Sequence, residues 1–316
     1  MTIQTGADRF RGDEILERLI RRRLAETKEL TDILAKFEVN HLIEPAIFYQ
    51  KAPDDVQFIG NTQYPKIIFV IDKFSNAERG KMGVLGVDIV CAETNITPEQ
   101  VEAIVRQSLE GVFFTPLNGI TFSAKWRESS LIEEAASDKS VLVIGISLSF
   151  DLYEYPLFES SDPDPIAAMN EYALNWEQNL IVIGRSELPD FFTPTRINPA
   201  IYFTKEQMKI ESQTNTVVWM RGFINTHLFA PTLIDRLEWL EQLNQHLSYA
   251  GEVTMLDRSP MFILSTNYDY HADEITGQLK LDVRYGLLRR PEYSHTLINA
   301  NMPQRKGRRW NPFTGR

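Results

Sequence analysis

The feature of this sequence that most constrains its fold is a pattern that occurs twice. The segment YPKIIF at positions 64–69 opens one apolar strand, and the segment NPAIYF at positions 198–203 opens another. Their prolines, Pro65 and Pro199, are 134 residues apart (199 − 65). Each segment precedes the same order of predicted elements: a strand, a helix that begins with proline, a strand, an acidic turn and an alternating strand. A pattern repeated at this distance predicts two small α+β domains of one design.

Local patterns indicate how each domain is built. In the first half, Thr97 and Pro98 begin a helix and Gly111 ends it. Residues 141–153 and 278–288 are the final strands of the two halves, and large apolar residues alternate with small or polar ones in both. Such strands bury one face only, so we expect each domain to be a mostly antiparallel β-sheet packed against helices. Residues 13–37 are predicted to form one or two N-terminal helices.

Two prolines and two aspartates mark the boundary between the predicted domains. They fall within residues 160–165, SSDPDP, which we interpret as a linker. The first domain, with the N-terminal helices, then covers residues 1–159. The second domain, of similar topology, covers residues 166–292. No periodicity is present beyond Pro291, and residues 293–316 are expected to be an extended basic arm.

Composition narrows the class of protein. A net charge of −10 argues against a general nucleic-acid binder, which is normally basic. The single cysteine, Cys91, excludes a disulfide within one chain, and its alternation with Val87 and Ile89 predicts that it packs in a sheet. No apolar run reaches the roughly 18 residues of a membrane span, and the N-terminus carries no apolar signal segment. We therefore expect no membrane partner and synthesis in a reducing cytoplasm.

No motif in the sequence indicates catalysis or a cofactor. None of the five histidines lies near a cysteine or a second histidine at a metal-ligand spacing, and phosphate-loop and nucleophile-elbow motifs are missing. We predict that the protein is not an enzyme and has no catalytic, cofactor-binding or metal-binding residues. The alternative is a hydrolase that uses a carboxylate pair such as Glu133 and Glu134. It predicts a deep pocket with convergent ionisable groups.

Acidic residues gather in the predicted turn before the last strand of each half. The candidates are Glu133, Glu134, Asp138, Asp269, Asp273 and Glu274. Like charge on the wall of a channel keeps DNA moving because it prevents binding. These residues are therefore candidates for facing a lumen through which DNA passes. Ordinary solubility of two exposed turns is the alternative explanation.

The C-terminal arm combines positive charge with aromatic side chains. Its candidate docking residues are Arg305, Lys306, Arg308, Arg309, Trp310 and Phe313. Aromatic anchors beside arginine are typical of protein interfaces, and an acidic neighbouring subunit would attract such an arm. A disordered basic tail and contact with nucleic-acid phosphates are the two other interpretations.

Six stretches of the first half carry a resemblance to a known family: residues 16–24, 45–51, 65–72, 86–92, 98–109 and 141–153. They give an N-terminal helix, a short strand with PAIFY, a strand with PKIIFV, a further strand, a crossing helix and a long hairpin. In this order they resemble the tail-terminator family of long-tailed bacteriophages, also described as tail-completion or head–tail joining proteins. The resemblance covers residues 10–156, with a weaker echo over residues 165–290.

The resemblance implies a structural virion protein of the tail or neck, made in the host bacterial cytoplasm and without catalytic residues. Family members form rings, commonly hexamers, that end the tail tube or sheath and provide the surface for joining the head. The implied partners are further copies of the chain, the tail tube, the sheath and the neck or head-completion proteins. DNA would pass through the lumen without specific binding.

This sequence departs from the family pattern in its second copy and its basic arm. Because of the second copy, six chains could form two stacked rings, or three chains could form one pseudo-sixfold ring. Another phage ring component, either a baseplate hub or a sheath-associated neck protein, is the alternative within the same class.

Overall fold

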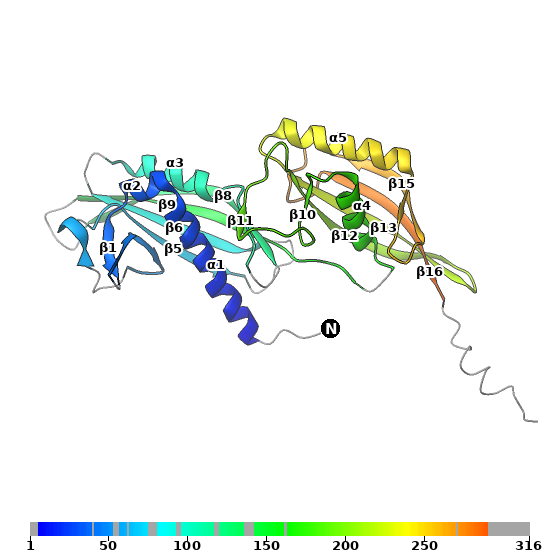
Figure 1. The fold of residues 1–316 in the computed structure, drawn as a ribbon, viewed down its shortest axis with the longest axis horizontal. Helices are drawn as coiled ribbons and strands as arrows, with labels where there is room; N and C mark the ends of the chain where they lie inside the picture. Colours follow the sequence, from blue (N-terminus) through cyan, green and yellow to red (C-terminus); the bar gives the residue numbers. More distant parts are fainter. Residues whose placement is uncertain are drawn as a thin grey trace, which may run out of the picture.

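Two similar units lie along the long axis of the molecule in the computed structural model (Figure 1). The structure describes residues 6–39, 41–52, 57–61, 63–74, 81–92, 96–116, 120–135, 142–160, 163–269 and 271–289. Each unit contains a mostly antiparallel sheet that packs against helices. The chain therefore has the predicted α+β fold of two tandem small domains.

The first sheet has seven strands in the order β11-β7-β8-β9-β6-β5-β3. Helices α1 (Gly6–Glu26), α2 (Lys28–Ile33) and α3 (Pro98–Leu109) belong to this domain. Strand β11 (Phe191–Phe192) is contributed by the second half of the chain. The other strands are β3 (Ile47–Tyr49), β5 (Lys66–Lys73), β6 (Lys81–Ala92), β7 (Phe113–Phe114), β8 (Thr121–Ala135) and β9 (Leu142–Tyr155).

The second sheet has six strands in the order β10-β12-β13-β16-β15-β14. Helices α4 (Pro165–Trp176) and α5 (Leu233–Ala250) pack against it. Its strands are β10 (Ile181–Val182), β12 (Ala200–Gln213), β13 (Val217–Phe229), β14 (Glu252–Thr254), β15 (Pro260–Tyr268) and β16 (Leu279–Leu288).

The two sheets have the same connectivity once β11 is set aside. The order β3-β5-β6-β9-β8-β7 in the first sheet corresponds strand for strand to β10-β12-β13-β16-β15-β14 in the second. In each sheet the outermost pair at one end, β3–β5 or β10–β12, is parallel, and the other pairs are antiparallel. Helices α3 and α5 occupy the same place in this order, between corresponding strands. The repeat predicted from the two proline segments is therefore a repeat of topology.

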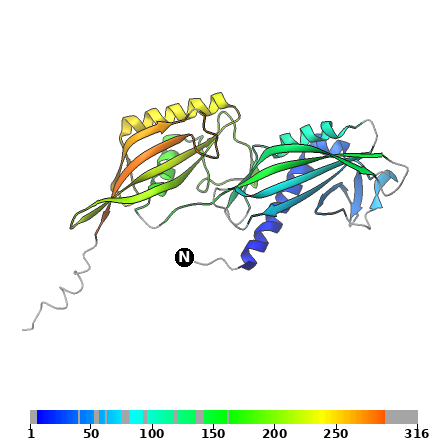
Figure 2. The same cartoon turned by 180° about the vertical axis from the view of Figure 1, so that it is seen from behind.

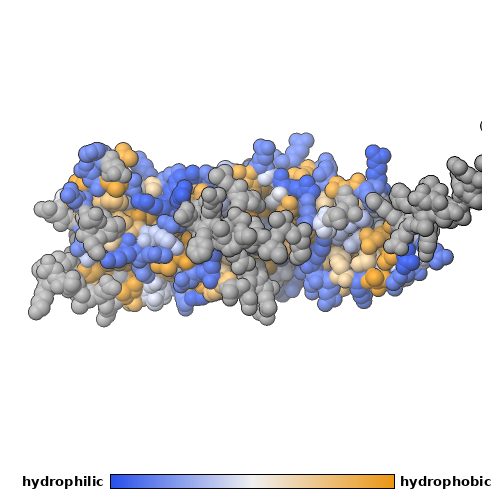
Figure 3. Space-filling view, turned by 90° about the horizontal axis from the view of Figure 1, so that it is seen from below, coloured by the Kyte–Doolittle hydropathy of each residue, from blue (hydrophilic) through white to orange (hydrophobic). Residues whose placement is uncertain are grey.

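Each domain has its own apolar core between its sheet and its helices. In β9, Leu148, Phe150 and Leu152 are fully buried, as the alternation predicts. The corresponding residues of β16, Leu279, Leu281 and Val283, are buried in the second core. Figure 2 shows the two sheets from behind. Figure 3, a view from below, shows hydrophilic residues mixed with hydrophobic patches. Cys91 is 1% exposed in the first core, and burial raises the pKa of its thiol to about 11.

A third, small sheet departs from the sequence prediction. The helix predicted to reach Phe37 ends at Ile33, and strands β1 (Lys36–Val39), β2 (Leu42–Pro45) and β4 (Gln57–Phe58) form a sheet in the order β2-β1-β4. Phe37 packs against Phe48 and Phe58, with ring centroids 5.1 and 6.4 Å apart. A four-residue strand is too short for periodicity to separate it from the end of a helix.

The predicted linker and the first acidic turn are also corrected at the level of single residues. Pro165 is the first residue of α4, and Asp164 is the N-cap of that helix, with its carboxylate accepting the Ile166 N–H at 2.9 Å. Asp164 is fully buried and pairs with Lys205 at 2.7 Å, so these residues belong to the folded domain. Glu133 and Glu134 lie in β8, opposite Ile144 and Val143 of β9, and not in a turn.

Candidate functional site at the domain junction

The two domains meet through a cluster of aromatic side chains. Phe113 of β7 lies at its centre, with ring centroids 4.9 Å from Phe229, 5.1 Å from Phe192 and 5.5 Å from Tyr155. Tyr155 in turn packs edge-on against Tyr202, at 5.3 Å. Phe113, Tyr155, Tyr202 and Phe229 are all buried. This aromatic junction cluster is separate from the two domain cores and joins them.

A strand of the second half clips onto the edge of the first sheet. Phe191 and Phe192 of β11 pair antiparallel with β7, and the N–H of Thr115 donates to the carbonyl of Asp190 at 2.8 Å. The Asp190 carboxylate also accepts from Arg22 of α1 at 2.6 Å, and the Arg22 guanidinium lies 5.0 Å from the centroid of the Phe191 ring. This is strand addition within one chain: main-chain bonds supply pairing and side chains fix the register.

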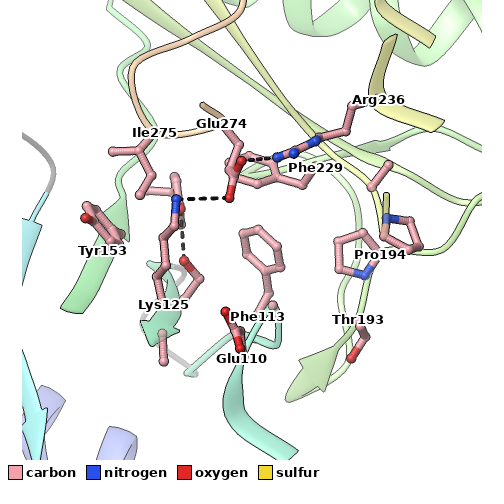
Figure 4. A pocket seen from close by; sticks show the side chains of 16 residues that line it. Glu110, Phe113, Lys125, Tyr153, Thr193, Pro194, Phe229, Arg236, Glu274 and Ile275 are labelled. Carbon is pink, nitrogen blue, oxygen red and sulfur yellow. Dashed lines mark hydrogen bonds and ion pairs between the residues drawn. The ribbon is translucent and has the colours of Figure 1, made fainter. Parts of the chain in front are cut away.

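A cavity of about 400 Å³ opens beside the aromatic junction cluster (Figure 4). Its apolar wall includes Phe113 and Phe229, and its polar rim includes Lys125, Arg236 and Glu274. The Lys125 ammonium of the first domain lies 3.5 Å from the carboxylates of both Asp273 and Glu274 of the second. Arg236 forms a further ion pair with Glu274. Opposite charges therefore connect the two domains across the rim.

The turn that carries Asp273 and Glu274 is held in place from below by buried polar side chains. His227 Nδ1 lies 3.0 Å from the carbonyl of Glu274, and its Nε2 lies 3.0 Å from the Thr204 hydroxyl. Since a carbonyl can only accept, Nδ1 carries the proton of the neutral ring. Gln278 bonds both the N–H and the carbonyl of Leu228. Burial alone would raise the pKa of Asp273, but hydrogen bonds from Thr276 and the charge of Lys125 lower it overall.

The buried histidine predicts a loss of stability on mild acidification. Burial lowers the pKa of His227 below the 6.5 of the free side chain, and the nearby Glu274 carbonyl and Asp273 charge oppose this only in part. Below pH 6.5 the unfolded chain takes up a proton that the folded chain refuses. The free energy of unfolding should therefore fall, by about 1.4 kcal/mol per pH unit until the folded-state pKa is reached.

Urea unfolding of the wild type and of His227→Gln, at about pH 7.5 and about pH 5, measures this effect. The variant should lose the part of the pH dependence that belongs to the histidine. His271→Gln is the matched control, because His271 is exposed. An equal pH dependence in the wild type and His227→Gln would show that His227 does not contribute.

The tyrosines of the junction are poor candidates for acid–base chemistry. Burial raises the pKa of Tyr155 well above its usual range, although a hydrogen bond with Ser123 at 2.9 Å opposes the shift. Burial also raises the pKa of Tyr202, whose hydroxyl donates to the carbonyl of Pro156 at 2.6 Å. These hydroxyls stay protonated at neutral pH. Among the described residues, no group of three or more histidine, cysteine, aspartate or glutamate side chains could hold a metal ion.

The predicted acidic residues do not share one environment. Asp273 and Glu274 lie at the junction and pair with Lys125, whereas Glu133 and Glu134 lie near the end of the β8–β9 hairpin. Asp269 lies in the β15–β16 connection, where its carboxylate accepts the N–H of His271 at 2.9 Å. Asp138 lies outside the described residues. A lumen-facing role for these side chains stays a prediction.

The predicted docking arm cannot be compared with the structure, because all six of its candidate residues lie outside the described part of the chain. They are Arg305, Lys306, Arg308, Arg309, Trp310 and Phe313. The sequence analysis missed the junction residues Phe113, Lys125, Asp190, Phe192 and Phe229. Two-residue strands have no periodicity to reveal them. The pairs FF at 113–114 and FF at 191–192 are the one signal that could have marked the junction.

Comparisons with known proteins found no match: not among protein-family models, not among curated proteins and not among solved structures. In the described part of the chain, none of the helices is long and apolar enough to cross a membrane.

Proposed function

We propose that this chain is a structural protein of a long-tailed phage, and that it forms a ring that terminates the tail tube or sheath and joins it to the head. Its ring would be made of copies of this chain, six or three in number, around a lumen through which DNA passes. Its other partners would be tail-tube, sheath and neck or head-completion proteins. It would act by assembly and not by catalysis.

The observation that carries the proposal is the way in which the two domains meet. The first domain contributes the end of β9 and the strand β7, and the second contributes the start of β12 and the end of β13. Two units of one topology therefore touch through different ends. A contact of this heterologous kind, repeated between chains, produces a closed ring if the rotation closes and a filament if it does not.

The order of elements in the first domain supports the same proposal. It retains the succession that resembles tail terminators: N-terminal helix, short strand, strand, strand, crossing helix and long hairpin. The second domain repeats the succession from its own short strand β10 onward. The duplication also supports a ring in which one chain supplies two neighbouring positions.

Negative-stain imaging of the purified full chain, with mass measurement in solution, tests the proposal. The expected result is a ring of defined mass with a central opening. The chain should also be detected by mass spectrometry and by antibody labelling at the head end of the tail in purified particles. Detection at the distal tip would favour the baseplate alternative. A chain that stays monomeric, alone and in particle extracts, would contradict the proposal.

Deleting residues 302–316 should weaken this assembly without unfolding either domain. The reason is the proposed docking of the basic, aromatic arm onto an acidic neighbour. Sedimentation as a function of protein concentration measures assembly, and urea unfolding checks the fold. A matched full-length control replaces Arg305, Lys306, Arg308 and Arg309 by glutamine and keeps Trp310 and Phe313. Unchanged assembly of the truncated chain would remove the arm from the mechanism.

A further inference from the structure

The strand that clips the two domains together has a counterpart elsewhere in the chain. Strand β11 is Phe191–Phe192, and strand β4 is Gln57–Phe58. The two lie 134 residues apart (191 − 57), the same offset as between Pro65 and Pro199. Each also lies in the connection between corresponding strands, β10 to β12 and β3 to β5. Strand β4 therefore occupies in the first domain the place that β11 occupies in the second.

The strand that receives the clip also has a counterpart. Strand β7 follows α3 and receives β11, whereas β14 follows α5 and is the last strand of its sheet. Within the described residues, no strand pairs with the outer edge of β14. The first sheet thus has its edge covered by the domain that follows it, and the second sheet has the equivalent edge open.

The open edge of β14 has main-chain groups available for pairing. Ile263 donates to the carbonyl of Gly251 and Met255 donates to that of Ser259, both at 2.9 Å. Alternate residues of an antiparallel strand bond to the same side, so the N–H and carbonyl groups of Glu252 and Thr254 point away from β15. Thr115 of β7 has this outward direction too, and it donates to Asp190 of the clip. An uncovered edge of this kind is a template for pairing with another chain.

Exposed apolar side chains accompany both the open edge and the unused clip. Beside β14, Tyr249 is 89% exposed and Leu256 is 45% exposed. Beside β4, Ile59 is 42% exposed, and Ile43 of the same small sheet is 66% exposed. Strand β4 bonds to β1 on one side only, and it ends the order β2-β1-β4. Both partners of the contact therefore carry the kind of surface that a neighbour covers.

We propose that β4 of one copy of the chain adds to the edge of β14 in the next copy, as β11 adds to β7 within one chain. The inference rests on the proposed ring and names the contact that would build it. The occupant of the β14 edge is a second copy of this chain, because the chain itself contains the matching clip at the matching offset. Repetition of this contact continues the arrangement of domains already present inside each chain.

A cysteine pair tests the register of the proposed contact. In the chain, Phe192 lies opposite Phe113, so Phe58 should lie opposite Glu252 of the next copy. Phe58→Cys with Glu252→Cys should give an oxidant-dependent cross-link between chains that neither single variant gives. Thr115→Cys with Asp190→Cys is the control, because these residues are bonded in one chain and should cross-link without a gain in mass. Cys91 is buried and should not interfere.

A proline substitution tests the main-chain bonds themselves. Thr254→Pro removes an outward N–H and leaves the bonds to β15 in place, which proline tolerates on an edge strand. It should raise the concentration needed for half-assembly by about tenfold or more. Thr254→Val keeps the N–H and should assemble like the wild type. Equal urea midpoints for the two variants would show that the fold is intact.

The outcomes separate this contact from the ring itself. A cross-link between chains together with the proline effect supports the contact. Rings that form without the cross-link, and equally well with Thr254→Pro, overturn the contact and leave the ring in place. A wild type that stays monomeric at every concentration and gives no cross-link overturns both.

Discussion

Replacing Phe113 by alanine should lower the free energy of unfolding by about 3–5 kcal/mol, the usual cost of removing a large buried aromatic side chain. The Phe113 side chain is 2% exposed and contacts aromatic rings from both halves of the chain. Its removal would leave a cavity between two rigid sheets, which cannot move together freely to fill it. Urea unfolding followed by tryptophan fluorescence and by circular dichroism measures the change.

The same substitution should also separate the unfolding of the two domains. Each domain has its own core, and the aromatic junction cluster is the apolar link between them. Phe113→Ala is therefore expected to give two transitions where the wild type gives one. Phe113→Leu, which keeps much of the volume, should cost less than about 1.5 kcal/mol. A single transition of Phe113→Ala at the wild-type midpoint would contradict the role given to the cluster.

Replacing Lys205 by methionine should cost about 3 kcal/mol, because it leaves a buried carboxylate without its cation. Asp164 is fully buried, and its carboxylate lies 2.7 Å from the Lys205 ammonium. Burial alone would raise the pKa of Asp164, but hydrogen bonds from Lys205, Ser160 and Ile166 lower it overall below 3.8. The wild type therefore keeps this contribution above pH 3.8 and loses it as the pH falls towards the folded-state pKa.

The double variant Lys205→Met with Asp164→Asn separates charge from packing. Asparagine retains the N-cap function and carries no charge, so the double variant should recover much of the stability lost by Lys205→Met alone. Urea unfolding at neutral pH measures both, and Lys209→Met on the same strand is the control for loss of an exposed lysine. If Lys205→Met matches Lys209→Met, the buried pair does not stabilise the fold.

Long elements of this fold could be predicted from sequence because their signals are local. The alternation in β9 and β16 follows from burial of one face, and it placed Leu148 and Leu281 in the cores correctly. Proline at the start of α3, after Thr97, gave the beginning of that helix because capping needs only neighbouring residues. The duplication was visible for the same reason, since two copies of one local order lie at a fixed offset.

Short elements and the junction could not be predicted in this way. Strands β1, β7, β11 and β14 have two to four residues each and exist because a partner strand lies beside them. Asp164 was assigned to a linker because its composition is that of a loop, yet a lysine 41 residues further on (205 − 164) makes its burial possible. Lys125 and Asp273 are separated by 148 residues, and no local pattern connects them.

The sequence by itself determined that this protein has two domains of one design, with alternating strands and capped helices, because these features depend on residues close together in the chain. Only the tertiary structure decided that β11 of the second half completes the first sheet, that an acidic turn closes the junction, and that the edge of β14 stays open. The physical reason is that strand pairing, ion pairing and aromatic packing are satisfied between residues brought together by folding, and these partners lie far apart in the sequence.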